Sequence, residues 1–494
     1  MKTFYVLGID QSTQGTKAVI FDAKGYLLKR VDVPHRQRIS EQGWISHSPS
    51  EIYENVLKAC KEVVSNSGVD PSAIRCMGIT NQRETTVVWD KVSGKELADA
   101  VVWQCNRAKD ICRDILEKYQ CGQIVYKKTG LKLSPYYPAA KMAWLIENIP
   151  KVKEKMEEGK VAFGTIDSWL LFKLTEGRVH RTEYSNASRT QLLNLETLEW
   201  DKEICRYFGI NENSLPEIVA SDHLFGKTTL GGFLEHPIPI CGMIGDSHGA
   251  LFGHDCRQPG KIKATYGTGA SVMLNTGTER IFSKHGLSTS IGWKVDGKIT
   301  YVLEGNINYA GAVISWLKED LGMIRQAKET EQFALQADQE DETYIVPAFS
   351  GLGAPWWNSD AKAMIVGMSR KTGKKELIKA ACDCIAHQIQ DVIDAMEGDT
   401  GLKIKELCVD GGPTRNQYLM QFQSDMAEAR IRIPQMEEVS VAGACYLAAM
   451  SAGVYERQTA YQAMHYECYT AKMQRETKMK KRQGWKQAIQ MLCK

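Results

Sequence analysis

The first thirty residues alternate between apolar runs of strand length and short polar turns. Residues 4–10 and 18–22 are apolar runs, and a polar turn that contains Gly15 lies between them. A second turn, Lys24-Gly25, leads into a third run over 27–33. Short apolar runs that are bounded by turn residues are typical of strands. The pattern therefore predicts a three-stranded meander at the start of the chain.

The pattern then changes from strand period to helix period. Ser48-Pro49-Ser50-Glu51 is a capping box with proline at the first helical position, and apolar residues follow at helical spacing. Strands alternate with helices along the rest of the chain, which predicts an α/β fold. The further helices that we expect span residues 107–119, 139–148, 166–175, 310–321 and 376–396.

A weak echo of the opening pattern is present in the second half of the chain. Residues 261–275 again contain a strand, a Gly-Thr-Gly turn and a strand. A chain of 494 residues is too long for one ordinary core. We therefore expect two similar domains that face each other, 1–250 and 251–494, with the boundary near residue 250.

Composition and charge narrow the class of protein. The chain has 43% hydrophobic and 24% charged residues, and its 62 basic and 59 acidic residues give a net charge of +3. This balance argues against a nucleic-acid or membrane-surface partner, and the basic stretch 472–483 is interpreted as a solvated helix face. The 14 cysteines are scattered and predict buried, reduced thiols. Asp10 interrupts the first apolar run and no stretch is long enough to span a membrane, so we expect a cytoplasmic protein.

Four polar residues, Asn81-Gln82-Arg83-Glu84, interrupt two apolar runs. Arg83 can donate to two hydroxyl groups, and Glu84 can accept hydrogen bonds from them. One interpretation is a site for a small polyhydroxylated ligand. The alternative is a surface ion pair that caps a turn, and these residues alone do not decide between the two.

Three turns have the composition of a phosphate-binding loop. The first, 10–17, begins with Asp10 at a strand end and contains hydroxyls, amides and Lys17; the second is 266–269, and the third is 409–416. Such a turn can surround a phosphate, and Asp10 could hold a hydrated Mg²⁺ beside it. Neither a Walker-type motif nor a Rossmann fingerprint is present. Three such turns in one α/β chain suggest a nucleotide with several phosphates.

Asp246 follows an apolar run over 238–244. An aspartate at the end of a strand is either a helix cap or a catalytic carboxylate, and the residue alone favours the cap. His248, two residues later, is interpreted as structural.

The most distinctive longer blocks of the sequence are 136–148, and 363–367 together with 376–383. Further distinctive blocks are 81–86, 164–169, 185–190, 347–355 and 419–425. Through these blocks the chain resembles the FGGY family of carbohydrate kinases, and within it the glycerol kinase branch. Residues 136–148 fit the first family signature, 363–367 with 376–383 fit the second, and the resemblance runs over about residues 4–465.

This resemblance implies two actin-like, ribonuclease-H-like ATPase domains that close on ATP, Mg²⁺ and a polyol or sugar. Asp246 resembles the general base of the family, and Asp10 resembles the carboxylate on the magnesium side. The resemblance also implies substrate contacts by Arg83, Glu84, Trp103, Tyr136, Asp246, Ser247 and Ser271. The implied nucleotide contacts are Thr13, Gln14, Lys17, Thr268, Gly311, Ser315, Gly412 and Asn416.

The chain departs from the pattern of the glycerol kinase branch mainly at the substrate pocket. Ser247 stands where a glutamine is usual, and Ser271 stands where a bulky aromatic residue is usual; Ser315 replaces a glutamine near the adenine. Two serines would enlarge the pocket and add hydroxyls. The acceptor is therefore either glycerol, as the family default, or a larger molecule such as erythritol, a pentitol or a pentulose such as xylulose. A third hypothesis is an actin- or Hsp70-like nucleotide switch without a small substrate. By analogy, a homodimer or homotetramer is expected.

Overall fold

The computed structural model describes residues 4–492; residues 1–3 and 493–494, which the two expected domains include, lie outside the described residues. The N-terminal part is built on a six-stranded sheet with the order β12-β13-β6-β1-β2-β3. Its strands are β1 (Tyr5–Gln11), β2 (Gly15–Asp22), β3 (Leu27–Pro34), β6 (Ile74–Asn81), β12 (Gly226–Thr228) and β13 (Ile238–Gly245). The meander β1-β2-β3 is antiparallel, as predicted, whereas β6 and β13 run parallel to β1.

The C-terminal part is built on a seven-stranded sheet with the order β16-β17-β15-β14-β20-β21-β22. Its strands are β14 (Ile262–Tyr266), β15 (Ala270–Gly277), β16 (Ser288–Val295), β17 (Lys298–Ile307), β20 (Glu406–Asp410), β21 (Arg430–Pro434) and β22 (Tyr466–Tyr469). Here too, an antiparallel succession (β14-β15-β17) is followed by two strands, β20 and β21, parallel to β14. The weak echo in the sequence is therefore a repeat of topology.

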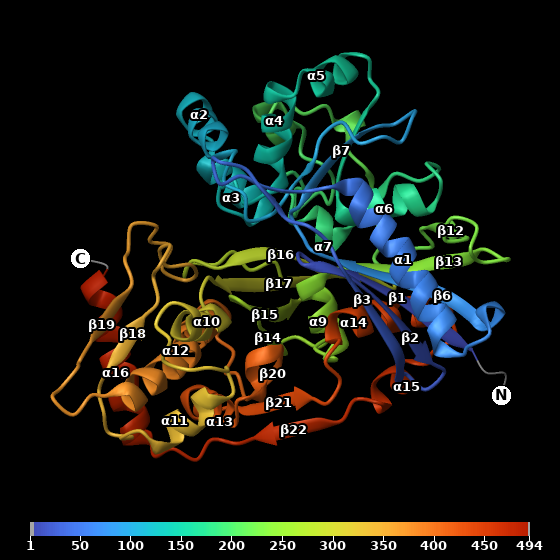
Figure 1. Ribbon diagram of the computed structural model, residues 1–494. Coiled ribbons are helices and arrows are strands. Elements are labelled where there is room, and N and C mark those ends of the chain that lie inside the picture. The colour runs from blue at the N-terminus through green and yellow to red at the C-terminus, as the bar shows by residue number, and fades with distance from the viewer. Residues whose placement is uncertain (1–3, 493–494) are drawn as a thin grey trace.

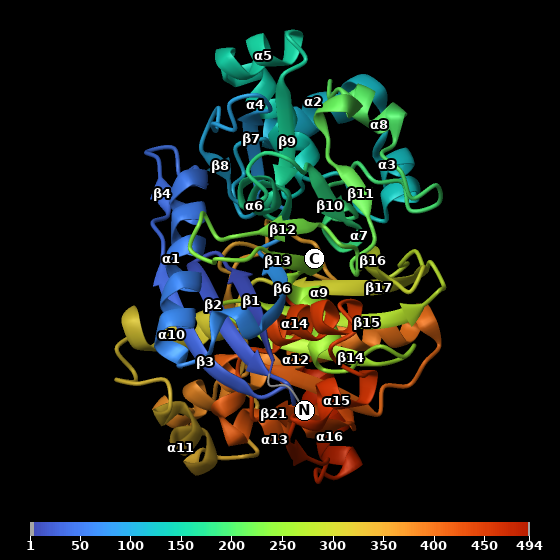
Figure 2. The same ribbon diagram turned by 90° about the vertical axis from the view of Figure 1, so that its right-hand side faces the viewer.

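A third sheet of five strands and a group of helices form the upper lobe in Figures 1 and 2. The strands are β4 (Arg38–Ile39), β5 (Ile45–His47), β7 (Thr86–Asp90), β8 (Ala100–Val101) and β9 (Val161–Thr165). The helices are α2 (Lys109–Tyr119), α3 (Gly122–Thr129), α4 (Pro138–Asn148) and α5 (Pro150–Glu157). This lobe is continuous with the first sheet, because β7 follows β6 after a turn of four residues.

The predicted helices are present, with small differences at their ends. Ser48 caps α1 (Pro49–Ser67) as predicted, by accepting from Glu51 N. The reciprocal half of the capping box is not formed, because Glu51 Oε1 accepts from Arg36 N instead. The helices expected at 166–175, 310–321 and 376–396 are α6 (Ile166–Leu174), α10 (Gly311–Glu319) and α12 (Lys374–Thr400). The remaining helices are α7 (Tyr184–Ala187), α8 (Lys202–Tyr207), α9 (Asp246–Gly253), α11 (Glu329–Gln336), α13 (Gln417–Ala427), α14 (Val439–Ser451), α15 (Arg457–Gln462) and α16 (Arg475–Leu492).

A row of glycines lets a helix from near the C-terminus pack on the N-terminal sheet. Gly8, Gly78 and Gly242 lie side by side on β1, β6 and β13. A Cβ at any of them would collide with α14, at Cys445, Ala444 or Ala448. Figure 1 shows α14 among the N-terminal elements, next to α9. The two halves therefore share a packed interface along β1, β6 and β13.

The structure confirms the expected state of the cysteines and contradicts the expected exposure of one basic residue near the C-terminus. The cysteines of the described part are free, and all but Cys468 are buried, as expected. The solvated face predicted for 472–483 is wrong at Arg482, which is buried and paired with Asp391 and Asp394. Among residues 4–492, no helix combines the length and the apolar character that a membrane crossing requires.

Candidate active site

Arg83 and Glu84 lie in the turn between β6 and β7, and both side chains are buried. They bind different partners: Arg83 pairs with Asp246 and Glu304, whereas Glu84 pairs with Arg189. The interpretation as a surface ion pair is therefore wrong. Buried ion pairs are costly to assemble, so a set of this kind suggests a functional role.

Arg83 joins the two halves of the molecule through its guanidinium group. Its Nε donates to Asp246 Oδ1 at 3.1 Å, and its two Nη atoms donate to Glu304 at 3.0 and 2.8 Å. Asp246 is the first residue of α9, whereas Glu304 lies on β17 of the second sheet. Asp246 retains 37% of its side-chain exposure. The carboxylate is thus held by Arg83 on one side and remains accessible on the other.

Glu304 is the centre of this buried charge network. Besides its two bonds with Arg83, its Oε2 lies 3.0 Å from Nη1 of Arg189. Burial alone would raise the pKa of Glu304, but Arg189 and Arg83 outweigh this effect and hold the pKa well below its usual range. Glu304 is therefore a carboxylate that neutralises two buried arginines.

Glu84 adopts an unusual backbone conformation at this point of the chain. Its φ is 60°, in the left-handed region that non-glycine residues rarely occupy. Its side chain accepts a hydrogen bond of 2.6 Å from Arg189 Nε. Backbone strain of this kind persists where the surrounding structure over-determines the position, and it clusters at functional sites.

Trp103 and Tyr136 form the aromatic side of the site. Their ring centroids are 5.7 Å apart in an edge-to-face arrangement. The indole of Trp103 also donates to Thr13 Oγ1 at 2.9 Å, so the aromatic wall touches the first phosphate-type turn. This contact brings a predicted substrate residue and a predicted nucleotide residue together.

The two serines that depart from the family pattern both join the same charge network. Ser247 Oγ accepts from Arg83 at 3.2 Å, and Ser271 Oγ donates to Glu304 at 2.9 Å. The buried Lys263 lies 3.4 Å from Ser271 Oγ. Both serines are half-buried, so they line the site and are hydrogen-bonded to the protein at the same time.

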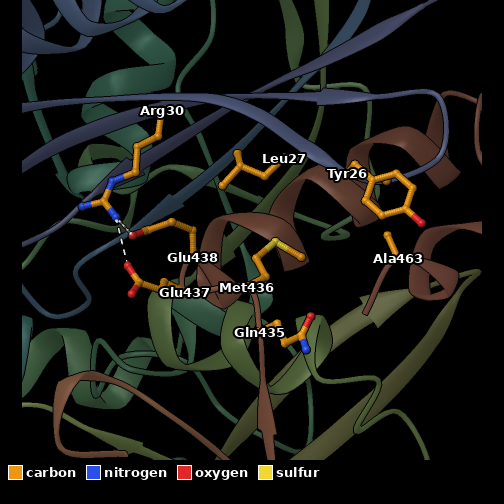
Figure 3. Close-up of a pocket in the computed structure, with 9 residues that line it drawn as sticks. Tyr26, Leu27, Arg30, Gln435, Met436, Glu437, Glu438 and Ala463 are labelled. Carbon is orange, nitrogen blue, oxygen red and sulfur yellow. Dashed lines mark ion pairs between the residues drawn. The ribbon is translucent and has the colours of Figure 1, made fainter. Parts of the chain in front are cut away.

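Asp10 and Lys17 flank the first turn, and Glu438 of the C-terminal half reaches them. Lys17 Nζ donates to Glu438 at 2.8 Å and lies 3.7 Å from Asp10. Glu438 also pairs with Arg30, beside a pocket of about 270 Å³ that Figure 3 shows. Burial raises the pKa of Asp10 to about 7; Lys17 opposes the rise, while Glu438 and Asp246 add to it. A cation beside Asp10 would relieve this cost.

The third turn lines a larger cavity, and the second turn contacts one of the lining residues. Gly267, in the turn between β14 and β15, contacts the start of α10, where Gly311 N donates to Gly267 O at 2.9 Å. The third turn touches the same region, because a Cβ on Gly411 would collide with Tyr266. The cavity has a volume of about 640 Å³ and includes four predicted nucleotide residues, Gly311, Ser315, Gly412 and Asn416. Gln14 and Thr268 are exposed in the first and second turns.

Several residues of the site were not found from the sequence. Glu304 left one signal, an acidic residue inside an apolar strand, because an unpaired buried charge is costly. Arg189 and Lys141 lie in blocks that resemble the family but were given no role. His248 is buried, as its structural interpretation requires, and burial holds its pKa well below the usual range.

Within the described residues, no group of three or more His, Cys, Asp or Glu is arranged to hold a metal ion. This does not conflict with the magnesium site expected at Asp10. Mg²⁺ beside a nucleotide is usually held by one or two carboxylates together with phosphate oxygens and water. Asp10 fits such a role, because its Oδ1 is buried without a hydrogen-bond partner.

Comparison with known proteins identifies the relatives of this fold and site. The chain is 46% identical to glycerol kinase 1 of Thermotoga maritima over 490 residues, which cover 99% of each chain. The crystal structure of Plasmodium falciparum glycerol kinase with ADP matches with a TM-score of 0.92 and 34% identity, covering 99% of this chain and 98% of that chain. The xylulose kinase of Lactobacillus acidophilus has a TM-score of 0.88 at 20% identity, with 99% and 97% of the chains covered, and shows the same fold.

These likenesses confirm the expected fold of two actin-like, ribonuclease-H-like ATPase domains. The N-terminal domain of the FGGY family of carbohydrate kinases matches residues 5–253, and the C-terminal domain of that family matches residues 262–452. The nucleotide-switch hypothesis is thereby set aside. The chain belongs to the FGGY family of carbohydrate kinases and is an ATP-dependent kinase.

Proposed function

We propose that the protein transfers the γ-phosphoryl group of ATP to glycerol, giving glycerol 3-phosphate and ADP. The observation that carries this proposal is the identity of 46% over 99% of both chains with a relative named glycerol kinase 1. The buried set of Arg83, Glu84 and Asp246 beside Trp103 and Tyr136 supports it, because a polyol needs donors, acceptors and an apolar wall.

Asp246 is the proposed general base. Its Oδ1 is held by Arg83 Nε and by the backbone N–H of Ser247, which leaves Oδ2 free to face the acceptor. The acceptor hydroxyl passes its proton to this carboxylate as its oxygen bonds to the γ-phosphorus. The bond from that phosphorus to the bridging oxygen breaks, and ADP leaves with the electron pair. A positioned carboxylate of this kind typically contributes about 10²–10⁴-fold in rate.

The nucleotide is proposed to lie across the three turns, with its phosphates near Thr13, Gln14, Lys17 and Thr268. Lys17 would exchange its bond with Glu438 for phosphate oxygens. The cavity of about 640 Å³, lined by Gly311, Ser315, Gly412 and Asn416, has room for adenosine. Asp10 would hold Mg²⁺, which neutralises phosphate charge when it is bound.

A larger acceptor is the second candidate, and Ser247 and Ser271 are the observation that favours it. Both are small, half-buried residues that line the site. A four- or five-carbon polyol or a pentulose would fill more of the space in front of them than glycerol does. Against this, both hydroxyls are already bonded to Arg83 and Glu304. We therefore propose glycerol as the preferred acceptor.

The test is ADP formation from ATP with glycerol, erythritol, the pentitols and xylulose, in the wild type and in Ser271→Phe. The proposal predicts the highest kcat/KM on glycerol for the wild type. Ser271→Phe is the discriminating variant, because a phenyl ring would exclude longer acceptors more than glycerol. A wild type that prefers a longer acceptor, and loses that preference in Ser271→Phe, would replace glycerol with the second candidate.

We also propose the division of the chain near residue 250, a cytoplasmic location and a homodimer or homotetramer. The start of α9 at Asp246, where the chain passes from the first sheet towards the second, supports the division. Light scattering of the purified protein would test the oligomeric state.

A further inference from the structure

Lys141 is a buried cation on α4 that the proposed chemistry does not use. Its side chain has no exposed area, and no carboxylate of the described residues lies within ion-pair distance. A buried ammonium group without a counter-ion is costly unless all of its hydrogens are bonded. The hydrogen-bond acceptors around its ammonium group must therefore compensate for the missing counter-ion.

Three backbone carbonyls accept the three hydrogens of this ammonium group. Lys141 Nζ donates to Glu84 O at 3.0 Å, to Trp103 O at 3.2 Å and to Tyr136 O at 2.6 Å. The three acceptors lie on separate segments: the turn after β6, the loop after β8 and the segment before α4. All three residues carry side chains that the proposed function assigns to the acceptor.

We propose that Lys141 is the positioning residue of the acceptor site, and that it fixes Glu84, Trp103 and Tyr136 relative to one another by bonding all three carbonyls. This inference rests on the proposed function for the roles of those three side chains. Lys141 does not touch the acceptor, because its ammonium group is enclosed by the backbone that it holds.

The backbone conformation of Glu84 shows why the hydrogen bond from Lys141 to its carbonyl oxygen is needed. Its φ of 60° is unfavourable for a residue with a side chain. Arg189 holds the carboxylate of Glu84, and Lys141 holds its carbonyl oxygen, so the residue is fixed from both ends. Without Lys141 the peptide would be free to relax, and the carboxylate would move with it.

The number of donors on the ammonium group, rather than its pKa, matches this role. Burial lowers the pKa of Lys141 to about 7, whereas Glu84 nearby raises it. Three carbonyl oxygens match the three donors of the ammonium form, while a neutral amine would leave one carbonyl without a partner. Cys105, Arg107, Cys112 and the ring of Tyr136 also lie around it.

Steady-state kinetics of Lys141→Met test the inference. We expect KM for the acceptor to rise about tenfold or more, because misplacement of binding groups by about 1 Å can cost two orders of magnitude. KM for ATP should stay within about twofold, since the adenosine cavity does not include Lys141. Lys141→Arg, which keeps the charge and the donors, should recover part of the loss.

The matched control is Lys128→Met in the same lobe. Lys128 is partly buried and pairs with Asp201 and Glu203, so its loss affects stability without touching the site. The inference is overturned if Lys141→Met leaves KM for the acceptor unchanged. It is also overturned if KM for the acceptor and KM for ATP change together, as a general loss of structure would cause.

Hydrogen exchange separates failure of this inference from failure of the proposed function. In Lys141→Met we expect faster exchange in three segments together, 82–86, 101–105 and 134–138, whether or not glycerol is the acceptor. Faster exchange in α4 alone would overturn the inference. A wild type without activity on any acceptor of the panel would contradict only the proposed function.

Discussion

The proposed acceptor side and the proposed nucleotide side of the candidate site are built in different ways. On the acceptor side, Arg83, Glu84, Arg189 and Glu304 are at most 6% exposed and bind one another. On the nucleotide side, Gln14, Thr268, Ser315 and Gly412 are exposed, and they lie on turns or beside a cavity of about 640 Å³. In the proposed site, the acceptor groups are thus positioned by the protein before binding, whereas the proposed nucleotide contacts lie on exposed turns.

The difference follows from what each ligand offers. A small polyol has few atoms, so its orientation must come from side chains whose positions are already fixed. ATP carries several charges and a large base, and backbone N–H groups with a spacious cavity are enough to hold it. Substitutions on the acceptor side should therefore disturb both folding and catalysis, while those on the nucleotide side should change ATP binding alone.

Glu304→Gln should have the largest effect on stability. It removes the negative charge that two buried arginines share, and breaking a buried ion pair typically costs about 3–5 kcal/mol. We expect a fall of this order in the free energy of unfolding, measured by chemical denaturation. Glu217→Gln is the control, because it breaks an exposed pair with Arg181 and should cost at most about 1 kcal/mol. Equal losses in the two variants would show that the buried network around Glu304 contributes no more to stability than an exposed ion pair does.

A fall in pH should lower the stability of the lobe that contributes to the proposed acceptor side. His47 on β5 is buried, and burial lowers its pKa to about 3. The unfolded chain, with a histidine pKa near about 6.5, therefore takes up the proton first as the pH falls, and stability is lost between about pH 6.5 and pH 3. At pH 5 the preferential protonation of the unfolded chain lowers the free energy of unfolding by about 2 kcal/mol for one histidine.

His47→Phe removes this titration and keeps an aromatic ring of similar size. The difference in Tm between pH 7.5 and pH 5 should therefore be smaller in the variant than in the wild type. Differential scanning calorimetry at the two pH values measures it. An unchanged difference would show that His47 does not contribute to acid sensitivity.

Ser315→Ala should have the smallest effect. Ser315 is exposed at the edge of the large cavity, and one hydrogen bond of a neutral hydroxyl is worth about 0.5–1.5 kcal/mol at most. Because solvent competes at this position, we expect KM for ATP to rise by about threefold or less, with KM for the acceptor unchanged. A rise of tenfold or more would mean that the nucleotide side also depends on fixed side chains.

The sequence predicted most of the elements, and the structure brings several of the predicted site residues together. The meander, the Ser48 cap of α1 and the repeated hairpin are present because local patterns specify them. Asp246, Arg83 and the glycine turns lie at strand ends, and parallel topology brings such ends to one edge of a sheet. The cavity includes Gly311, Ser315, Gly412 and Asn416 together.

The sequence did not predict contacts that depend on the packing of distant segments. Glu304 is separated from Arg83 by 221 positions, and nothing local to either residue specifies their pairing. The glycines of β1, β6 and β13 are needed because α14 packs against them, and α14 is distant from these strands in the sequence. The sequence around Arg482 indicates a solvated basic face. Its burial depends on ion pairs with Asp391 and Asp394 of another helix, and the sequence of its own helix gives no sign of them.

The most direct test of this account is glycerol-dependent ADP formation by the wild type and by Asp246→Asn. The substitution keeps the size of the side chain and an oxygen for Arg83, but it removes the base. We predict a fall in kcat of about 10²–10⁴-fold with KM for glycerol changed by only a few-fold. A variant that retains most of its kcat would contradict the role of Asp246. A wild type that forms ADP at the same rate with and without glycerol would contradict the account of the acceptor site as a whole.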